Sequence, residues 1–231
     1  MTRKTGIAIG LLVSFLSSSA VAYEGEHGDK KMVVGGNLSL GFAMVAGDGY
    51  EEIYNTPIID SDINRDNRTA KFSIGGDAYF DFYFTPMLGV EAGIGFLTKG
   101  IRFADGSWTH KTALTYMEIP VCFKVDYRHF QGTVGLALFV ALSGYTKTTY
   151  DNEEEKTKWG DDEWEYVHRA NLGPKMSFSY AIPVGPVFVV PGVSWSMHLI
   201  NDLNNDEIPG DAAHNMRANN LMFNVGAEWG F

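Results

Sequence analysis

The chain has 231 residues, of which 45% are hydrophobic and 20% charged, and its formal net charge is −10 at pH 7. An acidic balance of this size argues against nucleic acid as a partner. The single cysteine, Cys122, cannot form an internal disulfide. After the leader, no stretch stays apolar over the roughly 18 residues of a membrane-spanning helix, so any insertion into a membrane must use strands.

The N-terminus predicts a cleaved secretory signal peptide over residues 1–22. It has a basic start, an apolar run from Gly6 to Leu16 and small residues at 20–22. An anchoring helix is the weaker alternative, because the run is shorter than the ~20 residues that span a bilayer. Residues 23–31 are expected to be a short polar tail, and residues 32–231 a single domain.

From Val34 onward, apolar side chains recur at every second position with small or polar residues between them. In the first such segment the apolar set is Val34, Leu38, Leu40, Phe42 and Met44. This period predicts strands with one apolar and one polar face. Eight strands are expected, at about 32–45, 69–84, 88–98, 113–126, 130–144, 167–181, 187–197 and 217–231.

The predicted connections alternate between short and long. Those at 85–87, 126–129 and 182–186 are short, whereas those at 46–68, 99–112, 145–166 and 198–216 are long and polar. The alternation predicts an all-β, eight-stranded, antiparallel up-and-down transmembrane β-barrel in the bacterial outer membrane, with short periplasmic turns and long extracellular loops. Ten strands remain open if the first long loop contains a hairpin.

Alternation alone does not say which face is inside, since a soluble lipocalin-like barrel would place its apolar face inward. Side-chain size favours the membrane. Bulky residues such as Phe80, Leu136, Phe223 and Trp229 share the apolar face, while glycines are frequent on the other. An eight-stranded barrel has an interior just wide enough for side chains, so we expect the large apolar face to contact lipid.

The last strand carries an outward apolar row that ends on the terminal residue and includes Phe223, Val225, Trp229 and Phe231. This row resembles the C-terminal signal that the barrel-assembly machinery recognises in outer-membrane proteins. The expected partners are therefore that machinery and outer-membrane lipid or lipopolysaccharide, with a monomeric barrel. An extracellular ligand, if there is one, is not identified by these residues.

The segment Leu114–Val121 reads Leu-Thr-Tyr-Met-Glu-Ile-Pro-Val. It resembles the Tyr-Leu-Glu-Ile-Pro strand motif of the PorT-like outer-membrane β-barrel family, often labelled porin family, with Met117 in place of the usual leucine. The strand plan is also similar to the small OmpX and OmpA-type barrels. The resemblance implies a fold and a location and supplies no catalytic residues. Pro120 within a strand predicts a bulge or a locally unpaired position.

Nine charged residues share the predicted inward parity: Lys71, Asp77, Asp81, Glu91, Glu118, Lys124, Arg169, Lys175 and Glu228. Unpaired charges in a narrow lumen would be costly. We therefore predict a cross-lumen network of ion pairs that fills the barrel. The alternative is a small polar channel for ions or small solutes.

The predicted loop at 145–166 is strongly acidic and contains Trp159 and Trp164. Its carboxylates could bind Ca²⁺ or Mg²⁺ or a basic partner, but the spacing matches no EF-hand, which favours a solvated surface loop. The loop at 46–68 is more apolar and would either bind a partner or extend its hairpin. The histidines are dispersed, so no metal site and no cofactor are expected.

A lipid-modifying hydrolase is the enzymatic alternative. Ser196 and His198 lie two apart, with Asp202 close by as an orienting acid. No Gly-x-Ser-x-Gly elbow accompanies them. The sequence therefore favours a non-enzymatic outer-membrane protein with a structural, envelope or surface-binding role through its extracellular loops.

Overall fold

The computed structural model describes residues 31–47, 68–105, 108–150, 153–160, 164, 167–200, 202 and 216–231. The predicted signal peptide, nearly all of the N-terminal tail and most of the first long loop lie outside these residues. In the part of the chain so described, no helix is long and apolar enough to cross a membrane.

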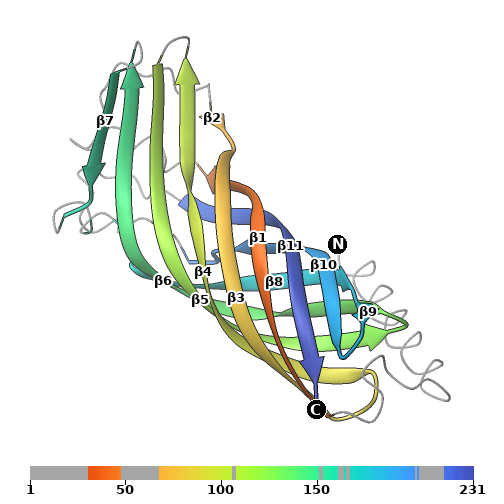
Figure 1. The fold of residues 1–231 in the computed structure, drawn as a ribbon. Coiled ribbons are helices and arrows are strands. Elements are labelled where there is room, and N and C mark those ends of the chain that lie inside the picture. Colours follow the sequence, from red (N-terminus) through yellow and green to blue (C-terminus); the bar gives the residue numbers. More distant parts are fainter. Residues whose placement is uncertain are drawn as a thin grey trace, which may run out of the picture.

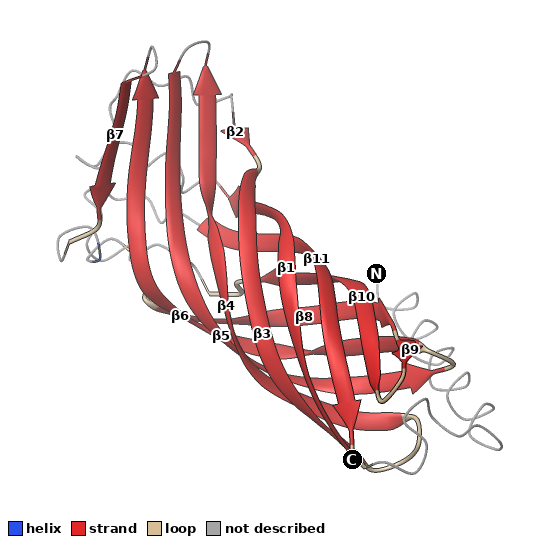
Figure 2. Cartoon of the chain, in the orientation of Figure 1, coloured by secondary structure: helices blue, strands red, loops and turns tan. Residues whose placement is uncertain are grey.

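Eight strands form one closed antiparallel ring (Figures 1 and 2). They are β1 (Met32–Gly47), β3 (Lys71–Tyr83), β4 (Leu88–Asp105), β5 (Trp108–Tyr127), β6 (Phe130–Tyr150), β8 (Ala170–Tyr180), β10 (Val187–Met197) and β11 (Met216–Gly230). Each pairs with its neighbour in this order, and β11 closes the ring on β1 from Val33↔Gly230 to Gly47↔Met216. The predicted eight-stranded fold is confirmed.

Three short strands pair outside this ring. They are β2 (Arg68–Thr69), which pairs with β4, β7 (Glu153–Lys158), which pairs with β6, and β9 (Ile182–Val184), which pairs with β10.

The outer face of the ring is a belt of large apolar side chains. Leu38, Phe72, Val121 and Val225 are between 57% and 76% exposed. The intervening side chains, such as Asp81 at 0%, are buried in the interior and are frequently polar. Apolar residues outward and polar residues inward are the architecture of outer-membrane β-barrels, and this confirms the predicted assignment of the two faces.

The connections at the end of the barrel that holds the C-terminus, here called the turn end, are tight. Arg128 and His129 join β5 to β6, and both have positive φ, 48° and 69°. Positive φ at both positions is what the two-residue type I′ hairpin requires. The predicted short connections are confirmed.

At the opposite end, the loop end, β4, β5 and β6 continue well beyond the ring and are joined by β7 (Figure 1). We call residues 99–105, 108–115, 143–150 and 153–158 the strand extension. The predicted long loops at 99–112 and 145–166 are thus largely strand, paired up to Asp105↔Trp108 and Tyr150↔Glu153. Above the apolar belt both faces carry polar residues, so the period-two pattern that marks the lower strands is lost.

Two irregularities lie on β5 and β6. The pairing of β4 with β5 stops at Ala92↔Val121 and resumes at Gly95↔Glu118, so Pro120 has no partner on β4, as predicted. Higher up, Thr115↔Ser143 is followed by Tyr116↔Ala141, which leaves Leu142 as an extra residue in β6. A bulge increases the local twist and bends the strand, and this one lies where the ring passes into the strand extension.

We expect Val121→Arg to lower the free energy of unfolding in lipid vesicles by about 2–4 kcal/mol, because it places a charge in the apolar belt. Thr109→Arg is the matched control, since Thr109 lies on the same face of the same strand but in the strand extension, where the cost is about 0–1 kcal/mol. Reversible denaturant titration measures both values. Equal costs would mean that Val121 does not face lipid.

Candidate functional site

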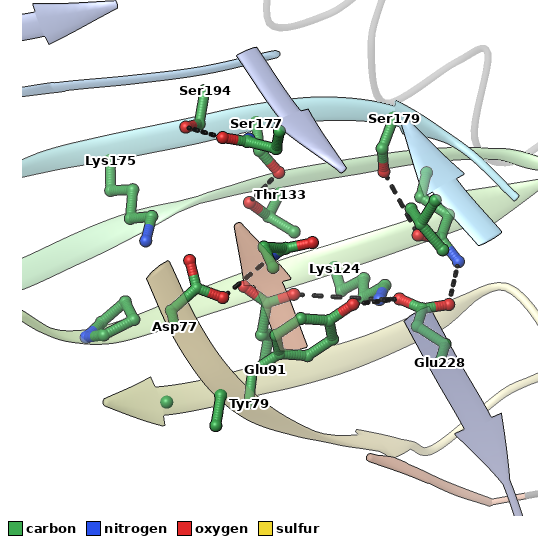
Figure 3. A pocket seen from close by; sticks show the side chains of 17 residues that line it. Asp77, Tyr79, Glu91, Lys124, Thr133, Lys175, Ser177, Ser179, Ser194 and Glu228 are labelled. Atoms are coloured by element: carbon green, nitrogen blue, oxygen red, sulfur yellow. Dashed lines mark hydrogen bonds and ion pairs between the residues drawn. The ribbon is translucent and has the colours of Figure 1, made fainter. Parts of the chain in front are cut away.

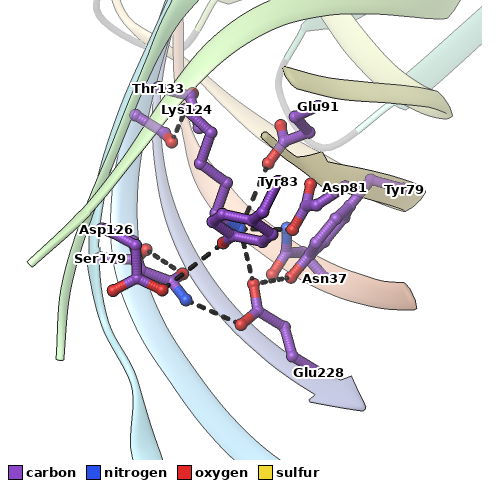
Figure 4. A network of polar contacts seen from close by, with 12 residues as sticks. Asn37, Tyr79, Asp81, Tyr83, Glu91, Lys124, Asp126, Thr133, Ser179 and Glu228 are labelled. Atoms are coloured by element: carbon purple, nitrogen blue, oxygen red, sulfur yellow. Dashed lines mark hydrogen bonds and ion pairs between the residues drawn. The ribbon is translucent and has the colours of Figure 1, made fainter. Parts of the chain in front are cut away.

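The lumen near the turn end is crossed by a cluster centred on Lys124 (Figure 4). The Lys124 Nζ lies 2.6 Å from Asp81 Oδ2, 3.0 Å from Glu228 Oε1 and 3.8 Å from Glu91 Oε2. Lys124, Asp81 and Glu228 are each at most 1% exposed. One buried ammonium thus contacts three carboxylates from three other strands.

Neutral donors complete this cluster. The Tyr79 hydroxyl donates to Glu228 Oε1 at 2.9 Å, and the Gln131 side-chain amide donates to Glu228 Oε2 at 2.8 Å. Ser179 Oγ in turn donates to the Gln131 carbonyl oxygen at 3.2 Å. Buried carboxylates need such partners, because the excess of negative charge would otherwise be desolvated without compensation. We call Tyr79, Asp81, Glu91, Lys124, Gln131 and Glu228 the Lys124 cluster.

The Lys124 cluster joins opposite walls of the barrel. Lys124 is on β5 and Glu228 on β11, and these strands are separated by three strands whichever way the ring is followed. Their contact at 3.0 Å therefore spans the interior rather than linking neighbours. Since an eight-stranded barrel encloses little more than its own side chains, this contact closes the lumen at that level.

The middle of the lumen is polar. Lys175 Nζ lies 3.1 Å from Glu118 Oε2, and Asn37 donates to Asp77 at 3.0 Å. A cavity of about 40 Å³ lies between these groups and the Lys124 cluster (Figure 3). A second, of about 20 Å³, borders Glu118 and Lys175 on the side of Ser196. Spaces of this size hold one to a few water molecules.

Toward the loop end the interior becomes apolar. Tyr116 and Phe139 are 2% and 0% exposed, and their rings lie 5.1 Å and 4.6 Å from the His198 ring, centroid to centroid. The Lys99 Nζ lies 3.8 Å from the Phe139 ring centroid, a cation–π contact. β5 and β6 supply the aromatic rings and the segment after β10 supplies the histidine, so this layer joins strands that are two and three positions apart in the ring.

Trp159 and Trp164 cover this apolar layer. Both pack against the buried cluster that contains Leu97, Leu114 and Tyr116, and their rings meet edge to face at 5.2 Å. The Trp159 indole N–H donates to Thr146 Oγ1 at 2.9 Å. The expectation of a wholly solvated loop is therefore wrong at these two residues, because burying the indoles against the interior outweighs the acidity of the neighbouring segment.

The segment after β10 is held by Asp202. Its carboxylate accepts from His198 Nδ1 at 2.5 Å, from the Asn171 amide at 2.9 Å and from the backbone N–H of Ala218 at 2.6 Å. Among the described residues, Ser196 makes no hydrogen bond to His198, whose ring is fully buried. His198 and Asp202 thus hold the segment after β10 against β8 and β11.

The structure brings together four of the nine predicted lumen residues in the Lys124 cluster, pairs Glu118 with Lys175 and places Asp77 beside the larger cavity. Lys71 is buried but apart, and its Nζ donates to the carbonyl of Phe72 at 3.2 Å. Arg169 is exposed on a bend before β8, and its Cζ lies 5.1 Å from the centroid of the Trp164 ring. Because β8 begins at Ala170, the strand parity does not extend to Arg169.

Sequence reasoning did not single out Tyr79, Gln131 or Lys99. Tyr79 lies on the same inward parity as Asp77 and Asp81, so extending the search from charged to all polar inward side chains would have found it. The same applies to Gln131, whose parity matches the buried Thr133. Lys99 lies in a segment that was predicted as loop, where no parity was assigned.

The row proposed as an assembly signal lies on the outer face of β11. Phe223, Val225, Trp229 and Phe231 are 57%, 61%, 49% and 51% exposed, and the last two rings are 5.5 Å apart.

No protein-family model matches the chain, and no curated protein matches its sequence. Several solved structures are similar in fold at low identity. Neisserial surface protein A is 8% identical over 87% of this chain and 97% of that protein, with a TM-score of 0.41. Ail of Yersinia pestis is 11% identical over 86% and 99%, with a TM-score of 0.44. OprG of Pseudomonas aeruginosa is 12% identical over 87% and 96%, with a TM-score of 0.43.

We expect Lys124→Met to destabilise the barrel by about 3–5 kcal/mol, because it leaves three carboxylates buried without their cation. Lys31→Met removes the same charge at an exposed residue next to β1 and should change stability by at most ~0.5 kcal/mol. Urea titration of both variants in detergent provides the comparison. Similar small effects in the two would contradict the closed interior.

Proposed function

We propose that this chain is an integral protein of the bacterial outer membrane that neither conducts nor catalyses. Its role is structural or one of binding at the cell surface, carried by the parts that extend beyond the barrel. The observation that supports this most directly is the contact of Lys124 with Glu228 across the full width of the interior. A barrel closed in this way offers no path for solutes.

Two independent layers support the closed state over the narrow-channel alternative. The Lys124 cluster closes the turn end with charged and hydrogen-bonded groups, and Tyr116, Phe139 and His198 close the loop end with buried rings. The described cavities between them have volumes of about 40 and 20 Å³. An ion would have to break a buried salt bridge and then displace an aromatic layer, and each step is costly.

The strand extension supports a role at the surface. It places four paired strands beyond the apolar belt on one side of the barrel (Figure 2). Hydrogen-bonded strands lose less conformational entropy on binding than flexible loops do, so a rigid extension is suited to presenting side chains to a partner. On its inner face, burial lowers the pKa of His110 to about 4, so this ring is neutral at pH 7.

We expect the wild-type chain to be silent in planar-bilayer recordings. Lys124→Ala with Glu228→Ala removes one layer, and Tyr116→Ala with Phe139→Ala removes the other; each double variant should stay silent because the other layer persists. The variant that combines all four changes should show discrete openings. Heat-modifiable gel mobility identifies the folded fraction of each protein.

Reproducible openings of the wild-type protein would favour the channel alternative. A folded four-site variant that remains silent would mean that some other part of the chain closes the lumen, and it would contradict the two-layer account.

A further inference from the structure

The outer face of the strand extension carries a row of cations in direct register. Arg102 on β4 pairs with Lys111 on β5, Lys111 pairs with Lys147 on β6, and Lys147 pairs with Lys156 on β7. Residues paired across neighbouring strands point to the same face. At the usual strand spacing of ~4.8 Å, these four residues span about 14 Å. We call them the basic row.

The basic row lies on the same face as the lipid-facing belt. Along β4, Phe96 is outward and 52% exposed, and Arg102 continues its parity. Along β5, Val121 is outward and 57% exposed, and Lys111 shares its parity. Leu142, which is 51% exposed, is the last large apolar residue before Lys147 on β6, and the two are about 17 Å apart along the strand. The row therefore lies on the lipid-facing side of the sheet, about 17 Å beyond the last large apolar residue of β6.

Placing like charges opposite one another destabilises a sheet, and the lysines of the row differ in their contacts. Lys147 forms an ion pair with Glu154 at 2.6 Å. The Lys156 Nζ lies 4.3 Å from the Tyr145 ring centroid, a contact that leaves its charge unneutralised. The chain as a whole has a net charge of −10, so a concentration of cations on one face is a local feature and not an average property.

Charge is also segregated along β7. Its sequence is Glu-Glu-Glu-Lys-Thr-Lys, and all six residues are exposed. Glu153 and Glu155 have the parity of the inner face, whereas Glu154, Lys156 and Lys158 have that of the outer face. The strand thus adds a net positive charge on the lipid-facing side and a net negative charge on the other.

We propose that the basic row binds the phosphate groups of an anionic outer-leaflet glycolipid, lipopolysaccharide, at the level of its head group. Two observations support this partner over an acidic protein: the charges are complementary, and the row continues the face that contacts the acyl chains. One lipid molecule can then place its chains on the belt and the phosphates of its more distant core sugars on the row. The proposal rests on the outer-membrane location proposed above.

The test compares two folded double variants of the full chain, purified from membranes in detergent. Lys111→Gln with Lys156→Gln neutralises two members of the row and keeps the pair of Lys147 with Glu154. Lys31→Gln with Arg128→Gln removes the same charge from exposed residues at the turn end. Surface plasmon resonance measures the affinity of each for rough lipopolysaccharide and for the same preparation after enzymatic dephosphorylation.

We expect the row variant to bind about 30-fold more weakly than the wild type, since each cation near an anionic lipid surface contributes about fivefold. The turn-end variant should bind like the wild type, and dephosphorylation should weaken wild-type binding by a similar factor. Equal binding by the two variants, or no effect of dephosphorylation, would overturn the proposal. The second comparison needs no variant, so it holds even if the row variant does not fold.

Conductance plays no part in this assay. A channel that opens in bilayers would overturn the closed lumen and leave the glycolipid site standing, whereas equal lipid binding would do the reverse.

Discussion

The structure depends on one constraint: the polar side chains that point into an eight-stranded barrel must satisfy one another. The ring is too narrow to hold bulk water, and the outward face is occupied by apolar side chains that contact lipid. Lys124 shows the solution. Its ammonium reaches carboxylates on β3, β4 and β11, while Tyr79 donates to the same oxygen of Glu228 that Lys124 contacts and Gln131 donates to the other. Because these partners come from opposite walls, the contacts that neutralise the buried charges also close the lumen.

The interior changes character along the barrel axis. Near the turn end it is closed by charge, and near the loop end by rings that pack around His198, with Trp159 and Trp164 above them. Asp202 ties the segment after β10 to the neighbouring strands at that level. The two layers differ in chemistry, since one consists of buried charge pairs and the other of packed rings.

The strand extension is continuous with the ring; β4 and β5 keep the parity of the strands below, whereas β6 changes parity at a bulge. The outer face passes from apolar belt to basic row along β4, β5 and β6, and the inner face continues from the buried layer. The bulge at Leu142 shifts the register of β6 by one residue at this transition. Without that shift Lys147 would fall on the opposite face from Lys111, so the row depends on a local irregularity in one strand.

From the sequence alone, the period-two alternation and the alternating lengths of the connections predicted a barrel of eight strands, with ten left open, and side-chain size predicted that the bulky face meets lipid while a set of charges points inward. Alternation is a local property, so it can be recognised in the sequence wherever one face of a strand is apolar. Above the belt both faces carry polar side chains and the alternation is lost, so the sequence predicts loops where the structure has strands. The tertiary structure alone decided which charges meet, because Lys124 and Glu228 are 104 residues apart and become neighbours only when the ring closes. The tertiary structure also decided that Arg169 lies outside the lumen, that two tryptophans cover the lumen and that four cations align. Each of these features depends on where a strand begins or on the register of a strand with its neighbours.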